Sequence, residues 1–459
     1  MLLEHSEHEQ GATRLRVGFE TLGCRSNFAD TMDIQAALKE RNVETCSFRE
    51  NADVYVINTC TVTDAADREA LRLIRRVRRN SPSARIVVTG CMAETGRETL
   101  EGTGMVDSVI GPGNRSAVVA AILGTEDRSA GENARRRSEI TKRSVSLNTP
   151  LSKHIGAPGE RVGSLRNRAR FHLRIQEGCE NACTFCIIPF SRGRLSSKAI
   201  TQILDDIDEL AELGYEEVIL TGTHLGGYGL DLDSHLLSLL EAITLHRPRP
   251  RLRLSSIDPN DLSVEIIRVL ATSDIFCKHL HICVQAFDDQ ILKRMNRRYR
   301  MADVQDIVRV ITEYLPDCCL GTDLITGFPG ETREQLEEQM AIYETLPFSY
   351  LHVFPYSERT LTAATRFGGV VEGGERKRRA ARWRALSERK LRSFMLQFVG
   401  RPVEIVVEQI EDELVLGTTG EFLLAGFPRS AVGGVRVGER LRGRVVSYDE
   451  RRSSLVCAC

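Results

Sequence analysis

Cys179, Cys183 and Cys186 share a short loop with the spacing C-x3-C-x2-C, directly after an apolar-alternating run at 171–175 that is typical of a strand. A strand that leads into such a loop can turn three thiolates toward one point, which suits a cubane iron–sulfur cluster. Three ligands on a four-iron cluster leave one iron without a protein ligand. A small molecule can bind there, as at the open position of a catalytic metal site. The spacing therefore predicts a catalytic cluster.

Three other interpretations of this loop are open: a zinc knuckle, a disulfide loop, or three ordinary buried cysteines. Zinc would require a fourth Cys or His at close spacing, and the nearest candidate, His172, precedes the loop on the predicted strand. The chain has 13 cysteines and no secretory features, which favours metal ligation or buried thiols over disulfides. The pattern favours the cluster.

A second set of cysteines, Cys24, Cys60 and Cys91, is widely spaced along the first part of the chain. Each follows a predicted strand in an alternating series of strands and helices at 15–22, 30–41, 53–58, 64–79 and 85–89. Such a βαβαβ pattern predicts parallel strands, whose carboxyl ends meet at one ligand-binding edge. We therefore expect these thiols to converge on a second cluster; the alternative is three unrelated loop thiols. Cys46 has no partner in this scheme and is interpreted as structural.

The middle of the chain repeats strand–helix units. Strands are predicted at 171–175, 217–221, 252–256, 279–284, 320–325 and 350–354, with helices at 199–213, 236–245, 261–270, 288–295, 302–314 and 333–345. Six such units predict a curved parallel sheet, a partial (βα)6 barrel, with its active site at the carboxyl ends of the strands. The fold class is therefore α/β, preceded by the N-terminal parallel sheet.

The last part changes character. Short strand-like runs with glycine breaks, at 403–407, 414–417, 422–424 and 442–446, predict a small antiparallel β-barrel. A basic helix at 375–394 contains the only tryptophan, Trp383, and is interpreted as packing the barrel onto the core or as a positive surface. The predicted domains are 14–126, a linker at 127–165, the core at 166–397 and the barrel at 398–459.

The stretch 125–170, which contains the predicted linker, is rich in Ser, Gly, Pro and Arg and lacks periodicity. Its basic residues are Arg135, Arg136, Arg137, Lys142, Arg143, Arg161, Arg166, Arg168 and Arg170. They form either a solvated tether or a contact for RNA phosphates. The formal net charge of the 459-residue chain is only -1, so any site for a polyanion must be local. No signal peptide or membrane-length apolar run is evident, which predicts a cytoplasmic protein without a membrane partner.

The cysteine loop, with Phe185 before its last cysteine, resembles radical S-adenosylmethionine (SAM) enzymes, and its continuation at 187–193 resembles the methylthiotransferases among them. The segments 21–24, 57–63 and 88–91 resemble the N-terminal cluster domain of that family. Those at 220–226, 253–257 and 293–299 resemble its core, and the C-terminal runs resemble its TRAM barrel. The resemblance covers nearly everything from about residue 15 onward except the linker.

This resemblance implies two [4Fe-4S] clusters and SAM as cofactors. The cluster on Cys179, Cys183 and Cys186 would chelate SAM and, with one electron from a donor protein, cleave it to a deoxyadenosyl radical. The cluster on Cys24, Cys60 and Cys91 would carry or supply the sulfur. One SAM would methylate that sulfur, and a second would furnish the radical that abstracts hydrogen from the substrate carbon. The predicted SAM-binding residues are Phe185, Gly222, Thr223, Ser255 and Gln285.

The run at 58–63, followed by 66–68, is most similar to the branch that acts on carbon 2 of N6-threonylcarbamoyladenosine at tRNA position 37. The partner would be a tRNA anticodon stem-loop, contacted by the arginine-rich helix after Cys60, the linker or the 375–394 helix. Other branches act on isopentenyladenosine in tRNA or on an aspartate of a ribosomal protein. The segment 283–288 departs from the family pattern. A non-catalytic RNA-binding protein would instead hold structural zinc and cleave no SAM.

Several other polar residues receive no catalytic role. His224 and His281 are interpreted as hydrogen-bonded loop and strand histidines. Four cysteines are interpreted as core thiols: Cys277, Cys283, Cys318 and Cys319. Cys457 and Cys459 form a terminal Cys-Ala-Cys that is either a strand end or a redox-active tail.

Overall fold

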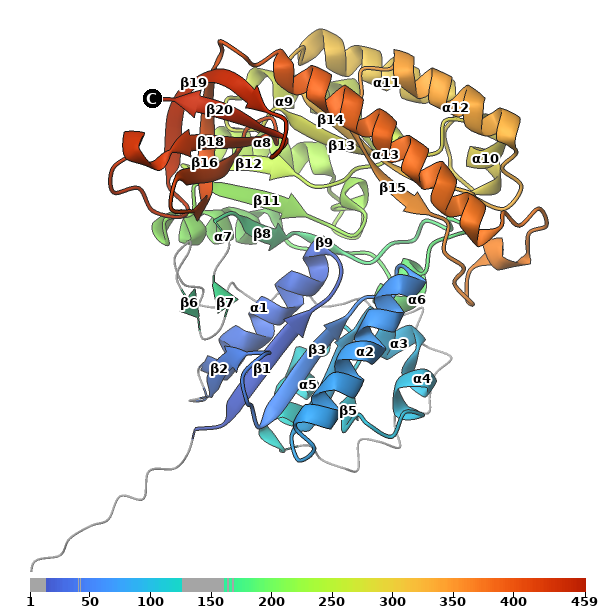
Figure 1. The fold of residues 1–459 in the computed structure, drawn as a ribbon, viewed down its shortest axis with the longest axis vertical. Coiled ribbons are helices and arrows are strands. Elements are labelled where there is room, and N and C mark those ends of the chain that lie inside the picture. The colour runs from blue at the N-terminus through green and yellow to red at the C-terminus, as the bar shows by residue number, and fades with distance from the viewer. Residues whose placement is uncertain (1–13, 40, 42, 126–160, 163–164, 167–168) are drawn as a thin grey trace, which may run out of the picture.

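The computed structural model describes residues 14–39, 41, 43–125, 161–162, 165–166 and 169–459, so most of the predicted linker lies outside the described residues. Figure 1 shows the N-terminal sheet on one side of the core, the small barrel at the C-terminus, and the helices α3 and α6 where the first sheet meets the core. None of the helices among the described residues has the length and apolar composition that crossing a membrane requires.

The N-terminal unit is one five-stranded sheet in the order β2-β1-β3-β4-β5, with every pair parallel. Its strands are β1 (Arg16–Thr21), β2 (Glu44–Ser47), β3 (Val54–Thr59), β4 (Arg85–Gly90) and β5 (Ser108–Val109). Its longer helices are α1 (Arg25–Lys39), α2 (Asp64–Asn80) and α5 (Arg115–Leu123). The predicted parallel sheet is confirmed. The short strands β2 and β5 and the uniformly apolar α5 were not predicted, and α1 begins directly after Cys24 rather than at residue 30.

The core has six parallel strands, as predicted. They are β8 (Phe171–Arg174), β11 (Glu217–Thr221), β12 (Arg251–Leu254), β13 (His279–Gln285), β14 (Cys319–Thr326) and β15 (Tyr350–Pro355). The sets β12-β11-β8 and β13-β14-β15 are joined by a parallel bridge between Ile257 and Ile282. The covering helices are α7 (Ile200–Glu212), α8 (Leu236–His246), α9 (Val264–Thr272), α10 (Asp289–Arg294), α11 (Met301–Tyr314) and α12 (Arg333–Thr345). One large apolar cluster fills the space between strands and helices.

The C-terminal unit is a closed barrel in the order β16-β17-β18-β20-β19. Its strands are β16 (Pro402–Ile410), β17 (Leu414–Thr419), β18 (Leu424–Pro428), β19 (Arg440–Asp449) and β20 (Ser454–Ala458). The predicted small barrel is therefore confirmed, with one strand more than the sequence indicated. Its pairs are antiparallel as predicted except for β18 with β20, which is parallel. That strand, β20, contains the buried Cys457, whereas Cys459 is exposed beyond its end. Cys457 thus belongs to a strand of the barrel core.

The basic helix is α13 (Gly373–Leu396), and its tryptophan is fully buried. The Trp383 ring stacks 6.0 Å from Phe287 and meets Tyr343 edge-on at 5.7 Å. These contacts place α13 in the core cluster and confirm its packing role. Several of its basic side chains form ion pairs: Arg376 with Glu358, Arg379 with Glu331, and Arg382 with Glu337. Much of the positive charge on α13 is therefore already neutralised.

A buried carboxylate, Glu217, organises the contact between core and barrel. Arg251 and Arg253 bind Glu217 at 2.8 and 2.7 Å and donate to barrel carbonyls of Thr418 and Thr419, both at 2.9 Å. Arg170, the last basic residue of the arginine-rich stretch 125–170, pairs with Glu217 and with Glu408. Its assignment as an RNA contact is therefore wrong, because its guanidinium is half-buried and committed to two carboxylates.

We expect Glu217→Gln to destabilise the protein by on the order of 3 kcal/mol, because it leaves buried arginines without their countercharge. Burial alone would raise the pKa of Glu217, but Arg253 and Arg251 outweigh it and hold the pKa far below its usual range. A carboxyl group whose pKa is lower in the folded than in the unfolded state stabilises the fold at any pH above its unfolded pKa. This stabilisation is lost as the pH falls from the unfolded toward the folded pKa. The urea midpoint of the wild type should therefore fall more steeply below about pH 4.5 than that of the variant.

The matched control is Glu337→Gln, which removes an exposed partner of Arg382. Exposed pairs contribute at most about 1 kcal/mol, so the control should shift the midpoint only slightly. Equal shifts for Glu217 and Glu337 would contradict the role given to Glu217.

Candidate active site

The structure brings together the three widely spaced cysteines. Cys24 follows β1, Cys60 follows β3, and Cys91 begins α3 (Cys91–Thr95) after β4; these strands are neighbours in the sheet. The side-chain oxygen of Asn27 lies 3.8 Å from Cys24 Sγ and 3.9 Å from Cys91 Sγ. A Cβ atom added to Gly23 would lie 2.8 Å from Cys60 Sγ. The convergence expected from parallel strand ends is therefore present in the fold.

Glycines precede two of these cysteines for a steric reason. Gly23 and Gly90 have φ values of +97° and +91°, a region that side chains rarely occupy. A Cβ on Gly23 would come 2.5 Å from Cys60 Cβ, and one on Gly90 would collide with the Thr59 carbonyl. The backbone can thus bring the ends of β1 and β4 against the end of β3 only with glycine there.

The second cysteine set lies in a loop before the short helix α6 (Ile188–Arg192). Backbone hydrogen bonds hold the loop, among them those from Thr184 N to the Met295 carbonyl at 3.1 Å, from Cys179 N to the Gly193 carbonyl at 3.2 Å and from Ala364 N to the Thr184 carbonyl at 2.8 Å. Arg297 donates through Nη1 to Cys183 Sγ at 3.2 Å. A guanidinium in this position can stabilise the negative charge that Cys183 carries as a thiolate ligand of a metal cluster.

The chemistry of both sets fits iron–sulfur ligation. Burial, with a smaller contribution from neighbouring thiols, raises the pKa of Cys60 to about 12, that of Cys179 to about 11 and that of Cys186 to about 12. Such thiols become thiolates at neutral pH only when a cationic group displaces their protons. Cys60 and Cys91 are buried, the three loop cysteines are half-buried, and Cys24 is exposed. Two clustered sets of thiols, one of them beside the Arg297 guanidinium, can hold such centres.

A cavity of about 200 Å³ lies beside Cys186 and the residues that follow Cys60. It is lined by residues that come from both parts of the chain and from the ends of the core strands: Val62, Thr63, Phe185, Cys186, Ile187, Ile188, Gln285, Asp323, Ile325, Phe354, Pro355, Tyr356 and Ser357. Val62 and Thr63 follow Cys60 directly, and Phe185 precedes Cys186. The cavity is therefore shared by the N-terminal unit and the core, at the carboxyl ends of the core strands, where parallel barrels place their active sites.

The predicted SAM-binding residues fall into two groups. Phe185 and Gln285 line the cavity. Gly222 and Ser255 lie together at the ends of β11 and β12, with a 3.4 Å hydrogen bond from Gly222 N to Ser255 Oγ, and Thr223 donates to Glu177 at 2.6 Å. None of these three is among the described residues that line the cavity. Their contact with SAM stays a prediction.

Gln285 has an unusual backbone. Its φ is +71°, at a bulge in the pairing of β13 with β14. Left-handed conformations of residues other than glycine cluster at ligand sites, where the surrounding structure holds them in place. This backbone conformation supports a binding role for Gln285, in addition to its position at the end of β13.

A polar network missed by the sequence reasoning lies beside the cavity. The Asp323 carboxylate lies 2.9 Å from His281 Nε2 and 3.3 Å from His352 Nδ1, and Cys283 Sγ donates to it at 3.4 Å. Burial would raise the pKa of Asp323, but the imidazoles of His281 and His352 outweigh it and hold the pKa far below its usual value. In the sequence, this network could have been recognised only from the polar residues that alternate with apolar ones within β13, β14 and β15.

One of the four cysteines predicted to be core thiols faces a polar group instead. Cys318 and Cys319 are buried as predicted, and Cys46 is buried within β2. Cys283 and Cys277 are only half-buried, and the Cys283 thiol faces a carboxylate rather than an apolar core. The core interpretation is therefore wrong for Cys283, because the inner face of the strands is polar beside the cavity.

The two histidines are hydrogen-bonded, as predicted. His281 contacts the Tyr350 hydroxyl at 3.1 Å as well as Asp323. His224 Nε2 lies 2.9 Å from Asp261 and 3.2 Å from Asn181, the latter within the cysteine loop. Burial would lower the pKa of His224, but Asp261 outweighs it and raises the pKa. His224 therefore connects the cysteine loop to the loop after β11.

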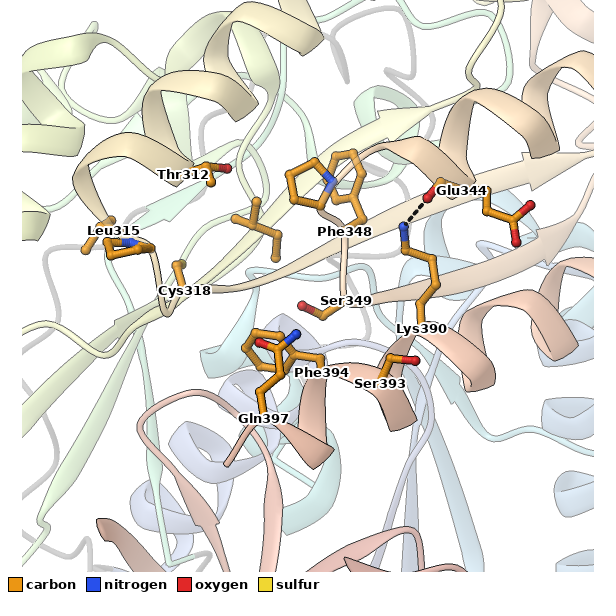
Figure 2. Close-up of a pocket in the computed structure, with 13 residues that line it drawn as sticks. Thr312, Leu315, Cys318, Glu344, Phe348, Ser349, Lys390, Ser393, Phe394 and Gln397 are labelled. Atoms are coloured by element: carbon orange, nitrogen blue, oxygen red, sulfur yellow. Dashed lines mark hydrogen bonds between the residues drawn. The ribbon is translucent and has the colours of Figure 1, made fainter. Parts of the chain in front are cut away.

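A larger cavity, of about 370 Å³, lies at the opposite end of the barrel, between α11, α12 and α13. Figure 2 shows Lys390 pointing to the Glu344 carbonyl, which it contacts at 3.1 Å. Cys318 and Ser349, which precede β14 and β15, line this cavity, so it adjoins the amino ends of the strands. No cysteine of either set is among the described residues that line it, whereas Cys186 lines the smaller cavity.

A six-stranded parallel partial barrel with a three-cysteine loop after its first strand defines a radical-SAM enzyme. The family model described as Radical SAM superfamily matches residues 173–341, and the one described as Uncharacterized protein family UPF0004 matches residues 16–111. The solved radical SAM methyltransferase TsrM from Kitasatospora setae is 17% identical, with a TM-score of 0.56 over 74% of this chain and 75% of that one. This likeness shows the fold.

Curated relatives resolve the family further. The threonylcarbamoyladenosine tRNA methylthiotransferase MtaB of Bacillus subtilis is 36% identical over 90% of this chain and 90% of its own length. That of Aquifex aeolicus is 32% identical over 88% of this chain and 94% of its own length. A tRNA-2-methylthio-N(6)-dimethylallyladenosine synthase of Christiangramia forsetii is 29% identical over 85% of this chain and 83% of its own. The chain belongs to the radical-SAM tRNA methylthiotransferase family, whose enzymes use SAM and [4Fe-4S] clusters.

Proposed function

We propose that the protein inserts a methylthio group at carbon 2 of N6-threonylcarbamoyladenosine at tRNA position 37. Cys179, Cys183 and Cys186 hold the cluster that binds SAM, and Cys24, Cys60 and Cys91 hold an auxiliary cluster. The observation that carries this proposal is the shared cavity, since Thr63 and Phe185 line it from opposite parts of the chain. A cavity lined by Cys186 and by the two residues that follow Cys60 suits a reaction that needs both cysteine sets.

When bound, the first cluster supplies the electron that cleaves SAM and the auxiliary cluster supplies the sulfur. The chain's own residues position the reactants. The aromatic and aliphatic side chains of Phe185, Ile325 and Phe354 suit the face of a flipped-out base and exclude water. Gln285 and Asp323 offer hydrogen-bonding groups for the polar edge of the base.

The substrate branch is supported by relatives. The two cited proteins named for threonylcarbamoyladenosine are 36% and 32% identical to this chain, against 29% for the cited relative named for dimethylallyladenosine. The run at 58–63 lies at the end of β3 and the start of the cavity wall. We therefore retain dimethylallyladenosine as the second candidate nucleoside.

The RNA surface that we propose is α2. This helix begins directly after Val62 and Thr63, so a tRNA lying along it would reach the cavity. Its pairs between Arg68 and Asp64 and between Arg72 and Glu69 are exposed and thus weak, so phosphates can replace the carboxylates at little cost. On α13, by contrast, buried pairs commit part of the positive charge.

The test is nucleoside mass spectrometry of tRNA from cells with and without this protein, complemented by wild type or by a Cys60→Ala variant. Loss of the methylthio form of threonylcarbamoyladenosine, restored only by wild type, is the expected result. Loss of the dimethylallyl counterpart would move the protein to the second candidate. Unchanged tRNA, with a modified ribosomal protein instead, would overturn a tRNA substrate.

Filling the shared cavity is expected to separate SAM cleavage from substrate modification. Val62→Trp adds a ring at the cavity wall contributed by the N-terminal unit, where Val62 is exposed. Misplacing the base by about 1 Å can lower the rate on the order of 100-fold. We expect a loss of product formation of that size, with substrate-independent deoxyadenosine formation retained. Leu245→Trp, at an exposed site on α8, serves as the control.

A further inference from the structure

One arginine of the core reaches into the cysteine site of the N-terminal unit. Helix α6 starts two residues after Cys186 and ends at Arg192, and it packs against α3, which begins with Cys91. Figure 1 shows α6 at the junction of the two units. One short segment therefore has a SAM-cluster cysteine at one end and an auxiliary-site residue at the other.

The Arg192 side chain is 2% exposed and its contacts are ionic or polar. Nη1 donates to Glu177 Oε2 at 2.8 Å, and Nη2 lies 3.3 Å from Asp30 Oδ2 and donates to Asn27 Oδ1. The buried Nε has no hydrogen-bond partner among the described residues. A buried N–H without an acceptor is costly, which indicates that a further acceptor belongs here.

Asn27 fixes the position of the Arg192 guanidinium relative to the cysteines. Its Oδ1, the atom that Arg192 binds, is within 4 Å of the Cys24 and Cys91 sulfurs. Its amide donates to the Leu22 carbonyl at 2.7 Å and to the Thr59 carbonyl at 2.9 Å, so the side chain is fixed between the strand ends. The guanidinium therefore lies beside the thiols that would ligate the auxiliary cluster.

Of the two buried arginines in this interface, Arg192 is the one that also lies next to the cysteines. Arg174, in the same interface, pairs with Asp30, Asp33 and Glu177 but has no described contact with a cysteine of either set. Arg192 shares two of these carboxylates and also faces the cysteines. A three-thiolate cluster is anionic, and a buried cation or hydrogen-bond donor next to it favours the reduced, more negative state.

We propose that Arg192 is a positioning residue of the core that holds the auxiliary cluster and raises its reduction potential. This inference rests on the proposed auxiliary cluster. Through α6, Arg192 links the two cysteine sets. It can contact the auxiliary site only when the core and the N-terminal unit are packed together. Asn27 orients the guanidinium in this arrangement.

The experiment is a redox titration of the anaerobically prepared holoenzyme, followed by electron paramagnetic resonance with and without SAM, since SAM changes the signal of the cluster it binds. In Arg192→Gln, the ratio of reduced to oxidised auxiliary cluster should fall about tenfold at the wild-type midpoint, a shift of about 59 mV for one electron. The SAM-responsive signal should keep its midpoint. Arg192→Lys, which keeps the charge, should restore most of the shift.

Arg174→Gln is the matched control, because it breaks the same interface network without touching the cysteine site. It should leave the auxiliary midpoint unchanged. If Arg192→Gln instead loses about four of about eight irons and Arg174→Gln retains them, the holding role is supported. Equal shifts or equal iron loss in both variants, or no change in either, would overturn the proposal. A wild type with only one cluster would reject the auxiliary cluster itself rather than Arg192.

Discussion

Replacing Cys60 by alanine should abolish methylthio transfer and leave SAM cleavage intact. Cys60 is buried at the end of β3, and no other cysteine among the described residues follows that strand to replace it. Loss of a direct ligand exceeds the 10- to 100-fold effects of outer-shell changes, so product should fall by about 100-fold or more. Iron should drop from about eight to about four per chain. Deoxyadenosine formed without substrate turnover should persist.

Product and deoxyadenosine are measured together by mass spectrometry in a single anaerobic reaction with the tRNA. Cys46→Ala is the control, since this buried thiol lies on β2 outside the site, and it should retain both products and the iron. If Cys60→Ala still formed the methylthio nucleoside, the auxiliary site would have no part in the reaction.

The second large effect is expected from Cys186→Ala, which removes a proposed ligand of the SAM-binding cluster. Both deoxyadenosine and the methylthio nucleoside should fall below detection, because no electron can then reach SAM. The auxiliary cluster should remain, so that iron is again about four per chain. The two variants thus lose the same amount of iron but differ in deoxyadenosine, which identifies the function of each cysteine set.

The exposed Cys459 supplies the control for the second variant, since its thiol lies beyond the last strand of the barrel. Cys459→Ala should behave like wild type in iron content, deoxyadenosine and product. Retained SAM cleavage in Cys186→Ala would show that the loop cysteines do not hold the cleaving cluster.

Much of the fold was predictable because it depends on local periodicity. The buried run of β3 and the amphipathic α2 follow directly from the order of apolar and polar residues. The short β2 and the uniformly apolar α5 escaped prediction, since neither shows a clear period of 2 or 3.6. Strand β20 escaped for the same reason: it is recognisable only as the partner that closes the barrel between β18 and β19.

The sequence by itself determined which atoms can perform the chemistry. Cys179, Cys183 and Cys186 are held together by the covalent chain, and Cys24 and Cys91 follow strands whose parallel order the βαβ pattern implies. Ligand identity and local spacing are properties of the chain, so they can be seen before it folds.

The tertiary structure alone decided what surrounds those atoms. Arg192 approaches Asn27 across 165 positions, and Asp323 meets His352 only through the pairing of β14 with β15. The shared cavity likewise exists only because the N-terminal unit docks on the ends of the core strands. Such contacts depend on how whole elements pack, and packing is set by the sum of many weak long-range interactions that no local pattern encodes.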